Sequence, residues 1–446
     1  MQDATSAADQ SWYRSLDRSQ WKTLFATNLG WLFDGYETYA LILTVGVALH
    51  QLLEPTQYAQ IPAYAGTVIG ITLLGWGVGG MIGGVLADYI GRKRMMMYSI
   101  LAYSLMTGLS ALSQDWITFA IARFLVGVAI GSEWATGASM IAEIWPDRHR
   151  AKGAGLMQCG LGMGFFLASF IWLIVAPFGP DSWRIMYVIG ILPALLTLWI
   201  RRGIPESTLW QRTNERRRAA LDRRRSGARL EGEEAALTRF TIHGLFAEPA
   251  LAKRTIIVFL MSLTTTVGWW GISTWVPPFI GSTAAKAGLV GPAWASYAGM
   301  AYTAGAIAGY ASFGFLADAF GRRRVTITFF VLALILTPLL FLWTKDVTLL
   351  LVLACVNAYF SNGQYSWMPV WLPELYPTRM RATAIAFAFN APRFIAFLGP
   401  LLAGTLIVQF GGFGQAATIL ALIYFVGIIA APFLPETRGQ GLPEKV

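Results

Sequence analysis

Long apolar stretches alternate with short polar connections along the whole chain. About twelve of them, at roughly 18 to 25 residues each, are long enough to cross a bilayer as an α-helix. They begin near Leu24, Gly66, Met95, Trp116, Ala151, Arg184, Arg254, Ala293, Val325, Val347, Ala382 and Gly412. The pattern predicts an all-α membrane protein with twelve transmembrane helices, and an even number of spans places both termini on one side.

The polar connections differ in charge from one to the next. Basic residues gather in the loops after the even-numbered runs, as in Arg92-Lys93-Arg94 and Arg322-Arg323-Arg324, whereas the opposite loops hold little more than Arg184, Lys286 and Lys345. Basic loops stay in the cytoplasm by the positive-inside rule. We therefore expect a multi-pass protein of the cell inner membrane, surrounded by lipid, with both termini cytoplasmic.

Composition agrees with a membrane protein and excludes several functions. Of the 446 residues, 55% are hydrophobic and only 13% are charged, which is too apolar for a soluble globular protein. The net charge of +10 lies in short loops, so it does not indicate nucleic-acid binding. No cluster has metal-ligand spacing and no Walker-type loop is present. We expect no enzyme and no cofactor, with a proton as the coupling ion.

Three motifs occur twice, 230 or 231 residues apart. The pairs are 86–94 with 316–324, 143–151 with 374–382, and 204–207 with 434–437. This repeat predicts two parallel six-helix repeats related by an axis along the membrane normal. The expected divisions are a cytoplasmic N-terminal segment (1–22), an N-terminal six-helix bundle (23–202), a basic cytoplasmic linker (203–253), a C-terminal six-helix bundle (254–434) and a cytoplasmic tail (435–446).

The linker contains Arg216-Arg217-Arg218 and Arg223-Arg224-Arg225 among Ala, Leu and Glu. This composition favours a short amphipathic helix on the cytoplasmic face. The linker is interpreted as a solvated connector, with regulation or binding of anionic lipid as the alternative.

The repeated acidic and basic residues at the cytoplasmic helix ends predict a latch. Asp88 is placed to accept hydrogen bonds from a helix N-terminus or from an arginine, in a contact that breaks and reforms as the bundles move. The alternative is an interfacial anchor with topology charges. The expected gating residues are Asp88, Arg92, Arg94, Glu143, Asp318, Arg322, Arg324 and Glu374.

These motifs, with Arg123-Phe-Leu-Val-Gly127 and the Pro-Glu-Ser and Pro-Glu-Thr endings of the sixth and twelfth spans, resemble the major facilitator superfamily. Asp34-Gly35-Tyr36-Glu37 is similar to the Asp-Gly-Phe-Asp signature of proton-coupled carriers of organic acids, including aromatic acids and sialate. Gly131-Ser132-Glu133-Trp134 is similar to the Gly-Gly-Glu-Trp stretch of metabolite symporters. The resemblance implies a central cavity, lined mainly by the first, fourth, seventh and tenth helices, and alternating access by a rocker switch.

Ionisable residues inside apolar runs are the candidate coupling site, because charge in hydrocarbon is costly. At 1.5 Å of rise per residue, Glu37 lies roughly 21 Å from the cytoplasmic start of its span and Arg123 roughly 10 Å from the outside. These similar depths predict that Glu37 and Arg123 pair, either as a static salt bridge or as a pair that protonation opens. Asp34 and Glu37 take the proton in this scheme. Glu133 relays protons, closes the cytoplasmic side or makes a structural hydrogen bond.

Arg393 lies near mid-membrane beside Pro392 and is expected to hold a substrate carboxylate through two hydrogen bonds. The alternative is an internal partner for Asp34. Aromatic and amide residues complete the expected site. The predicted substrate-binding residues are Arg393, Asn390, Tyr36, Trp269, Trp270, Asn357, Gln364 and Tyr365, with Trp275, Asn362 and Trp367 on the same cavity wall.

The combined interpretation is a secondary active transporter that carries a small organic anion inward together with a proton, and we expect it to act as a monomer. The first alternative is a proton-independent facilitator for a sugar or polyol, which the Pro-Glu-Ser and Pro-Glu-Thr endings suggest. The second is a membrane sensor that signals through the basic linker.

Overall fold

The computed structural model describes residues 11–398 and 409–444, and their regular structure is helical. The helices of the first part of the chain are α1 (Arg18–Leu52), α2 (Ile61–Ile90), α3 (Arg92–Ser110), α4 (Trp116–Ile130), α5 (Glu133–Ile144), α6 (Arg150–Val175), α7 (Ser182–Ile189) and α8 (Pro193–Gly203). Those of the linker are α9 (Thr208–Arg225), α10 (Gly232–Leu237) and α11 (Thr241–Gly244). Those of the last part are α12 (Pro249–Ile272), α13 (Val276–Lys286), α14 (Gly291–Phe320), α15 (Arg322–Pro338), α16 (Val347–Ser361), α17 (Trp367–Leu375), α18 (Arg381–Asn390), α19 (Arg393–Ala396), α21 (Phe413–Ala421) and α22 (Tyr424–Ala430).

Short 3₁₀ segments join several of these helices, among them η4 (Ser273–Trp275) between α12 and α13. Within the described residues, eight helical stretches are long and apolar enough to cross a membrane. They are Arg18–Leu52, Pro55–Ile90, Trp116–Ile144, Arg150–Phe178, Pro249–Lys286, Arg322–Trp343, Val347–Leu375 and Phe413–Phe433. The all-α prediction is confirmed, and the remaining apolar runs coincide with the helices α3, α7–α8, α14 and α18–α19.

Helix starts follow local capping chemistry. Asp17 and Gln20 form a capping box at the start of α1, and Asp115 accepts hydrogen bonds from Ile117 N and Thr118 N at the start of α4. These backbone donors have no partner inside the helix, so the side chains satisfy them.

The Pro-Glu motifs of the repeat have a capping role of their own. Gly91 has φ of +109°, a conformation that other residues rarely adopt, and it ends α2 and begins α3. Glu206 Oε1 accepts hydrogen bonds from Arg92 N at 3.1 Å and Lys93 N at 3.2 Å. Glu436 accepts in the same way from Arg322 N at 2.9 Å in the second copy. The motif therefore stabilises a helix N-terminus twice.

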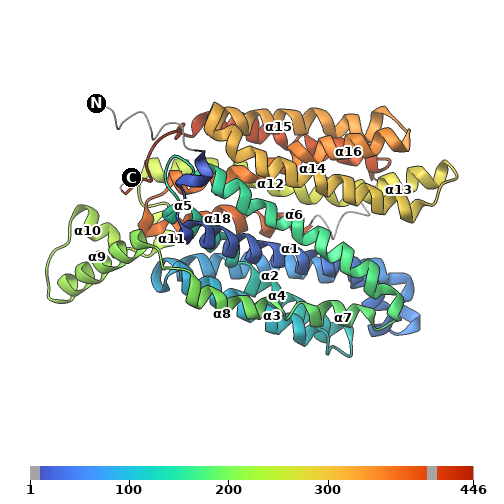
Figure 1. The fold of residues 1–446 in the computed structure, drawn as a ribbon, viewed down its shortest axis with the longest axis horizontal. Coiled ribbons are helices and arrows are strands. Elements are labelled where there is room, and N and C mark those ends of the chain that lie inside the picture. The colour runs from blue at the N-terminus through green and yellow to red at the C-terminus, as the bar shows by residue number, and fades with distance from the viewer. Residues whose placement is uncertain (1–10, 399–408, 445–446) are drawn as a thin grey trace.

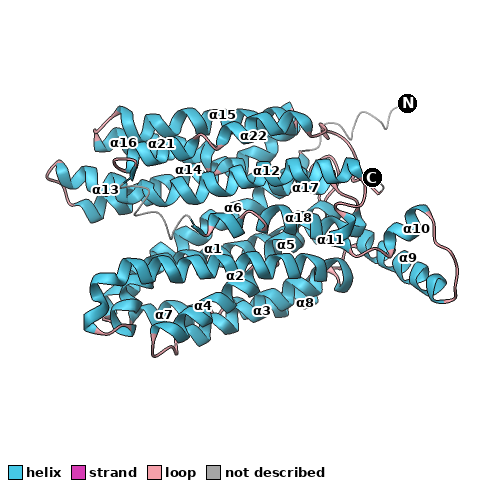
Figure 2. Ribbon diagram, turned by 180° about the vertical axis from the view of Figure 1, so that it is seen from behind, coloured by secondary structure: helices cyan, strands magenta, loops and turns pink. Residues whose placement is uncertain are grey.

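The helices run side by side along the long axis of the molecule in two groups, α1–α8 and α12–α22 (Figures 1 and 2). We call them the N-terminal helices and the C-terminal helices. Within the first group α1 packs on α6 and α2 on α4, and within the second α14 packs on α13 and α16. Close crossings use small residues, since a Cβ built on Gly79 would lie 1.8 Å from Val128 O. The two groups meet where α6 packs on α14 and α2 on α18.

The basic linker forms a helical hairpin. Helices α9 and α10 extend beyond the end of the bundle (Figure 1), held together by Arg216 with Glu233 at 2.7 Å and Arg223 with Glu234 at 2.6 Å. The predicted helix is confirmed as α9, and its position on the cytoplasmic face stays a prediction. Two of its arginines pair with acidic residues of α10.

Candidate functional site

Glu37 and Arg123 form a buried ion pair between α1 and α4, so the pairing predicted from their depths is confirmed. Arg123 also donates to Ser110 Oγ from Nε at 3.1 Å and from Nη2 at 2.6 Å, and its guanidinium lies 4.4 Å from the ring centroid of Tyr187. A buried charge pair needs such additional partners to offset the loss of water. The arrangement holds Arg123 in place and leaves Glu37 Oε2 with no hydrogen-bond donor among the described residues.

Asp34 and Glu133 lie together elsewhere in the N-terminal helices. The fourth span is interrupted at residues 131–132, so Glu133 is the first residue of α5, and its carboxyl group contacts that of Asp34. Asp34 is 0% exposed and Glu133 is 1% exposed. None of their four carboxyl oxygens has a hydrogen-bond donor within the described part of the chain. Asp34 thus contacts another acid and not Arg393, which was the alternative partner.

Arg393 is also buried, at the start of the short helix α19. Its guanidinium lies 3.9 Å from the ring centroid of Phe389 and 4.6 Å from that of Trp76, and Nη1 donates to Phe389 O. The chain turns between Asn390 and Arg393, which directs the side chain back over Phe389. Two rings cover the group, so its role as a carboxylate ligand stays a prediction.

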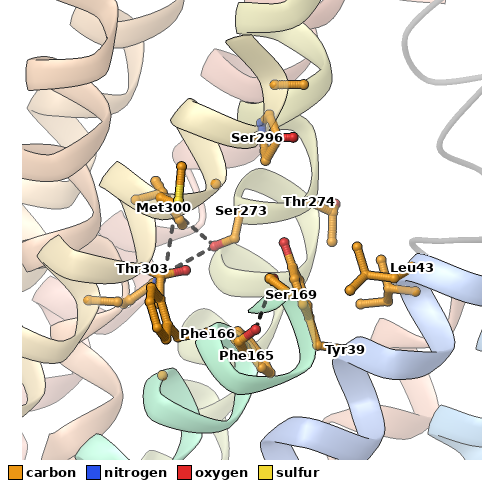
Figure 3. Close-up of a pocket in the computed structure, with 18 of the residues that line it drawn as sticks. Tyr39, Leu43, Phe165, Phe166, Ser169, Ser273, Thr274, Ser296, Met300 and Thr303 are labelled. Carbon is orange, nitrogen blue, oxygen red and sulfur yellow. Dashed lines mark hydrogen bonds between the residues drawn. The ribbon is translucent and has the colours of Figure 1, made fainter. Parts of the chain in front are cut away.

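A cavity of about 410 Å³ lies between the two groups of helices (Figure 3). Its lining residues come from α1, α6, the α12–η4–α13 segment and α14, with Asn362 from the tenth run. The resemblance implied the first, fourth, seventh and tenth helices. The fourth helix is absent from the described lining of this cavity. The fifth and eighth runs, which form α6 and α14, line it instead.

Hydroxyl and amide groups form one polar wall of the cavity. Ser273 Oγ and Tyr302 Oη lie 2.9 Å apart, and both donate to Asn362 Oδ1, at 3.0 and 3.3 Å. With its oxygen occupied, the amide nitrogen of Asn362 is the part of that side chain left to donate to a ligand.

Aromatic rings form the opposite wall. Tyr39 stacks on Phe165 with centroids 4.8 Å apart and planes at 18°, and Phe165 lies 5.9 Å from Trp269 (Figure 3). No charged side chain lines the cavity among the described residues. The site therefore offers flat apolar surface and neutral donors to a ligand.

The predicted substrate-binding residues divide by position. Trp269 lines the cavity, and Trp270 lines a water-sized pocket of about 20 Å³ together with Glu37 and Arg123. The others make internal contacts: Tyr36 Oη donates to Met186 O, Asn357 to Thr337 Oγ1, Gln364 to Ser361 O and Asn390 to Ala386 O, while Tyr365 packs on Trp269 and Phe389.

Sequence reasoning missed Tyr39, Phe165, Ser169, Ser273 and Tyr302, which line the cavity. The signal that could have found two of them is their position. Tyr39 lies two residues after Glu37, and Ser273 lies two residues before Trp275.

Residues predicted to form the latch make ion pairs at the far end of the helices, and their gating role stays a prediction. Arg92 pairs with Asp88 at 2.9 Å and with Glu143 at 3.0 Å, and Glu143 pairs with Arg381 of the C-terminal helices at 2.8 Å. Asp88 also accepts from Thr383 N at 2.9 Å and Thr383 Oγ1 at 2.7 Å. These contacts tie the two groups of helices together.

A second copy of the latch repeats the first. Arg322 pairs with Asp318 and with Glu374, both at 3.0 Å, and Arg150 of the N-terminal helices lies 3.4 Å from Glu374. Arg94 and Arg324, also predicted as gating residues, are exposed and form no ion pair within the described residues. Each follows the buried arginine of its helix by two residues, which places it on roughly the opposite face of that helix.

The cavity and the latch lie at opposite ends of the same helices. Ala295 lines the cavity near the start of α14, and Asp318 joins the latch near its end, about 35 Å of helix away. Both ends of the described chain lie at the latch end, since the Trp12 ring is 5.5 Å from Phe315 and Arg381 donates to Pro443 O at 3.4 Å.

A helical bundle with a cavity at one end and an ion-paired closure at the other has the architecture of a membrane transporter. The fold is similar to that of the proton:xylose symporter XylE, a major facilitator superfamily protein, with a TM-score of 0.74, 19% identity, and coverage of 95% of this chain and 98% of that one.

The chain matches the sugar (and other) transporter family over residues 23–445 and belongs to that family. The sialic acid transporter NanX of Escherichia coli (strain K12) is 27% identical over 93% of this chain and 94% of its own. The cis,cis-muconate transport protein of Acinetobacter baylyi is 27% identical over 94% of this chain and 95% of its own. The protein is a multi-pass membrane transporter and not an enzyme.

Proposed function

We propose that the protein is a proton-coupled symporter that imports a small organic anion by alternating access. Twelve spans in two parallel six-helix bundles, 23–202 and 254–434, carry out the movement, and the protein works as a monomer. Both termini and the linker 203–253 lie in the cytoplasm, and the membrane is the cell inner membrane. The basic loops at the latch end support this orientation.

One observation carries the proposal: the cavity is accessible between the two groups of helices while ion pairs close the opposite end. If the latch end is cytoplasmic, this is an outward-facing state. Release of substrate into the cytoplasm then requires Glu143 to part from Arg381 and Arg150 from Glu374, and return of the empty carrier requires these ion pairs to form again. Ion pairs that join the two groups of helices at one end support such a closure, because they can form in one state and part in the other.

A small carboxylate with a planar or hydroxylated body fits the cavity. The relatives are named for sialic acid and cis,cis-muconate, which are both organic acids. Asn362 and the hydroxyls of Ser273 and Tyr302 supply neutral hydrogen-bond groups, and Tyr39 and Phe165 supply ring surface. Arg393 receives the carboxylate in the state in which Phe389 no longer covers it.

The Glu37–Arg123 pair supports proton coupling. A proton on Glu37 would cancel the charge that holds Arg123, and would free the guanidinium to attract the anion. Import of one proton with a monoanion also moves no net charge across the membrane. The anion alone would have to be moved inward against the membrane potential, at a free-energy cost of about 2.3 kcal/mol per 100 mV.

Uptake into proteoliposomes tests the proposal. We expect an acidic exterior to drive accumulation of unsaturated, aromatic or sialic carboxylates by about tenfold per pH unit, because one unit is equivalent to about 1.36 kcal/mol for each proton. Glu37→Gln should abolish accumulation but permit counterflow. Accumulation that ignores the pH gradient in the native protein would contradict symport.

The second candidate is a proton-independent facilitator for a neutral sugar or polyol. The specific observation in its favour is the uncharged lining of the cavity within the described residues. It predicts equilibration of sugars with no accumulation and no response to Glu37→Gln.

A further inference from the structure

Asp34 and Glu133 form a second acidic site that the Glu37–Arg123 pair does not use. Their side chains come from α1 and α5, contact each other, and are 0% and 1% exposed. Burial removes water from both carboxyl groups, and such groups require a hydrogen-bond partner or a counter-charge. The partner of each carboxyl group is the other carboxyl group. Two ionised carboxylates cannot form a hydrogen bond with each other, because both only accept and neither carries a hydrogen.

No cation faces this pair from the described elements packed around it. The titratable groups that interact with it are Glu37 of α1 and Tyr103 of α3, and Tyr103 Oη is itself buried with no described partner. Arg123, the basic group nearest in sequence, is held by Glu37 and Ser110. Two negative charges without a cation would repel strongly in a medium of low dielectric constant.

A glycine allows the pair to form. The carboxyl group of Glu133 lies against the backbone of α1 at Gly30, where a Cβ would be 2.0 Å from Oε1. Gly30 precedes Asp34 by one helical turn, so the missing side chain leaves the space in which Glu133 reaches Asp34. Gly46 of the same helix is different, because a Cβ there would meet nothing within 4 Å.

We propose that Asp34 and Glu133 hold one proton between them, as a site separate from the Glu37–Arg123 ion pair, and that this proton is the one released on the cytoplasmic side. The inference rests on the proposed symport. In each cycle the O–H bond of protonated Glu37 breaks as one O–H bond forms on a carboxyl oxygen of the pair, and that bond breaks in turn when the proton passes to water on the cytoplasmic side. The pair carries one negative charge when loaded and two when empty, which favours reloading.

The path of release is set by aromatic contacts. Trp134, the residue after Glu133, stacks on Phe389 of the C-terminal helices with centroids 3.8 Å apart and planes at 18°. Trp31, three residues before Asp34, lies 5.9 Å from the same ring. In this proposal Phe389, packed on Trp134 and Trp31, covers the side of the pair that faces the C-terminal helices while the latch is closed. Separation of α18 from α5 removes this cover and admits water from the latch end.

Infrared spectroscopy of the purified protein tests the shared proton without any transport. The carbonyl stretch of a protonated carboxyl group should be present at neutral pH, should persist in Glu37→Gln, and should be lost in the double variant Asp34→Asn/Glu133→Gln. If the double variant does not fold, each single variant should shift or remove the same band, because the hydrogen-bond partner changes. A band that is unchanged in all of these variants would overturn the inference.

Two further readouts separate the possible failures. If sodium chloride, but not choline chloride, raises the melting temperature of the native protein and not of the double variant, the pair holds a cation and the inference is wrong. In proteoliposomes the double variant should lose the roughly tenfold accumulation per pH unit. If the native protein shows the band but no pH-driven accumulation, the symport proposal fails and the shared proton stands.

Discussion

Two regions of the molecule, 231 residues apart in sequence, share a framework but not a chemistry. In the first, Asp34 and Glu133 meet beside the interruption of a helix and none of their oxygens has a described donor. In the second, Thr265 donates to Gln364 Oε1 at 2.7 Å and Gln364 donates to Ser361 O at 3.0 Å. The second region is a satisfied neutral network, and the first requires a proton to become one.

The same difference extends to the ion pair. Glu37 and Arg123 correspond at the same offset to Gly268 and Ala354, whereas the latch residues recur as acids and arginines in both copies. Charge is thus duplicated at the ends of the helices, whereas at their centre the acids Asp34, Glu37 and Glu133 lie in the first copy and Arg393 lies in the second. The latch joins two bundles, so equivalent ion pairs from both copies contribute to it. The acids that bind the proton occur in the first copy alone.

The largest effect is expected from removal of Arg123. Arg123→Ala leaves Glu37 as a buried acid without its counter-charge, and the loss of one partner of such a pair costs about 3–5 kcal/mol. A matching fall in melting temperature should be measured by thermal unfolding in detergent, and Glu37→Gln in the same chain should restore part of it. Arg225→Ala, which breaks an exposed pair with Asp222, should change stability by less than about 1 kcal/mol.

The next effect separates the two latch copies. Asp88 pairs with Arg92 and also accepts two hydrogen bonds from Thr383, whereas the side chain of Asp318 is 17% exposed and its described partner is Arg322. Asp88→Asn should therefore cost about 1.5–3 kcal/mol and Asp318→Asn less than about 1 kcal/mol in thermal unfolding. Equal losses would mean that both copies close the bundle equally.

A smaller effect should follow from an acid placed in the neutral region. Gln364→Glu replaces a donor to Ser361 O with a carboxylate oxygen, at a cost of about 1–3 kcal/mol. An acidic medium should reduce the loss, because the protonated group donates again, so stability should fall as pH rises. Melting curves at acid and alkaline pH measure this, and Gln211→Glu on the exposed face of α9 should show no such pH dependence.

The smallest effect on stability is expected from Gly30→Ala, yet it should disturb the acid pair. The new methyl group would displace the flexible end of the Glu133 side chain, which costs free energy. Alanine favours a helix over glycine by about 1 kcal/mol, and this gain offsets that cost. Proton-driven accumulation should fall while the melting temperature changes little. Gly46→Ala on the same helix is the matched control, and equal accumulation in the two variants would argue against the role of Gly30.

Depth arithmetic predicted one part of the site and missed another. It paired Glu37 with Arg123 because both lie in long helices with a known rise. It did not pair Asp34 with Glu133, since that contact depends on how α1 and α5 are rotated about their axes. It placed Arg393 at mid-membrane, but the turn after Asn390 directs the guanidinium onto Phe389.

Sequence by itself determined the helical class, the apolar runs, the repeated motifs and the acids of the latch, because hydrophobicity and charge act locally and are written in order along the chain. It included the exposed Arg94 and Arg324 and missed Arg150 and Arg381, which pair with Glu374 and Glu143 of the opposite group of helices. Tertiary structure alone decided where the cavity lies, which residues line it, and which acids meet at the centre. These depend on the tilt and rotation of helices far apart in sequence, and only the packing of the whole bundle sets them.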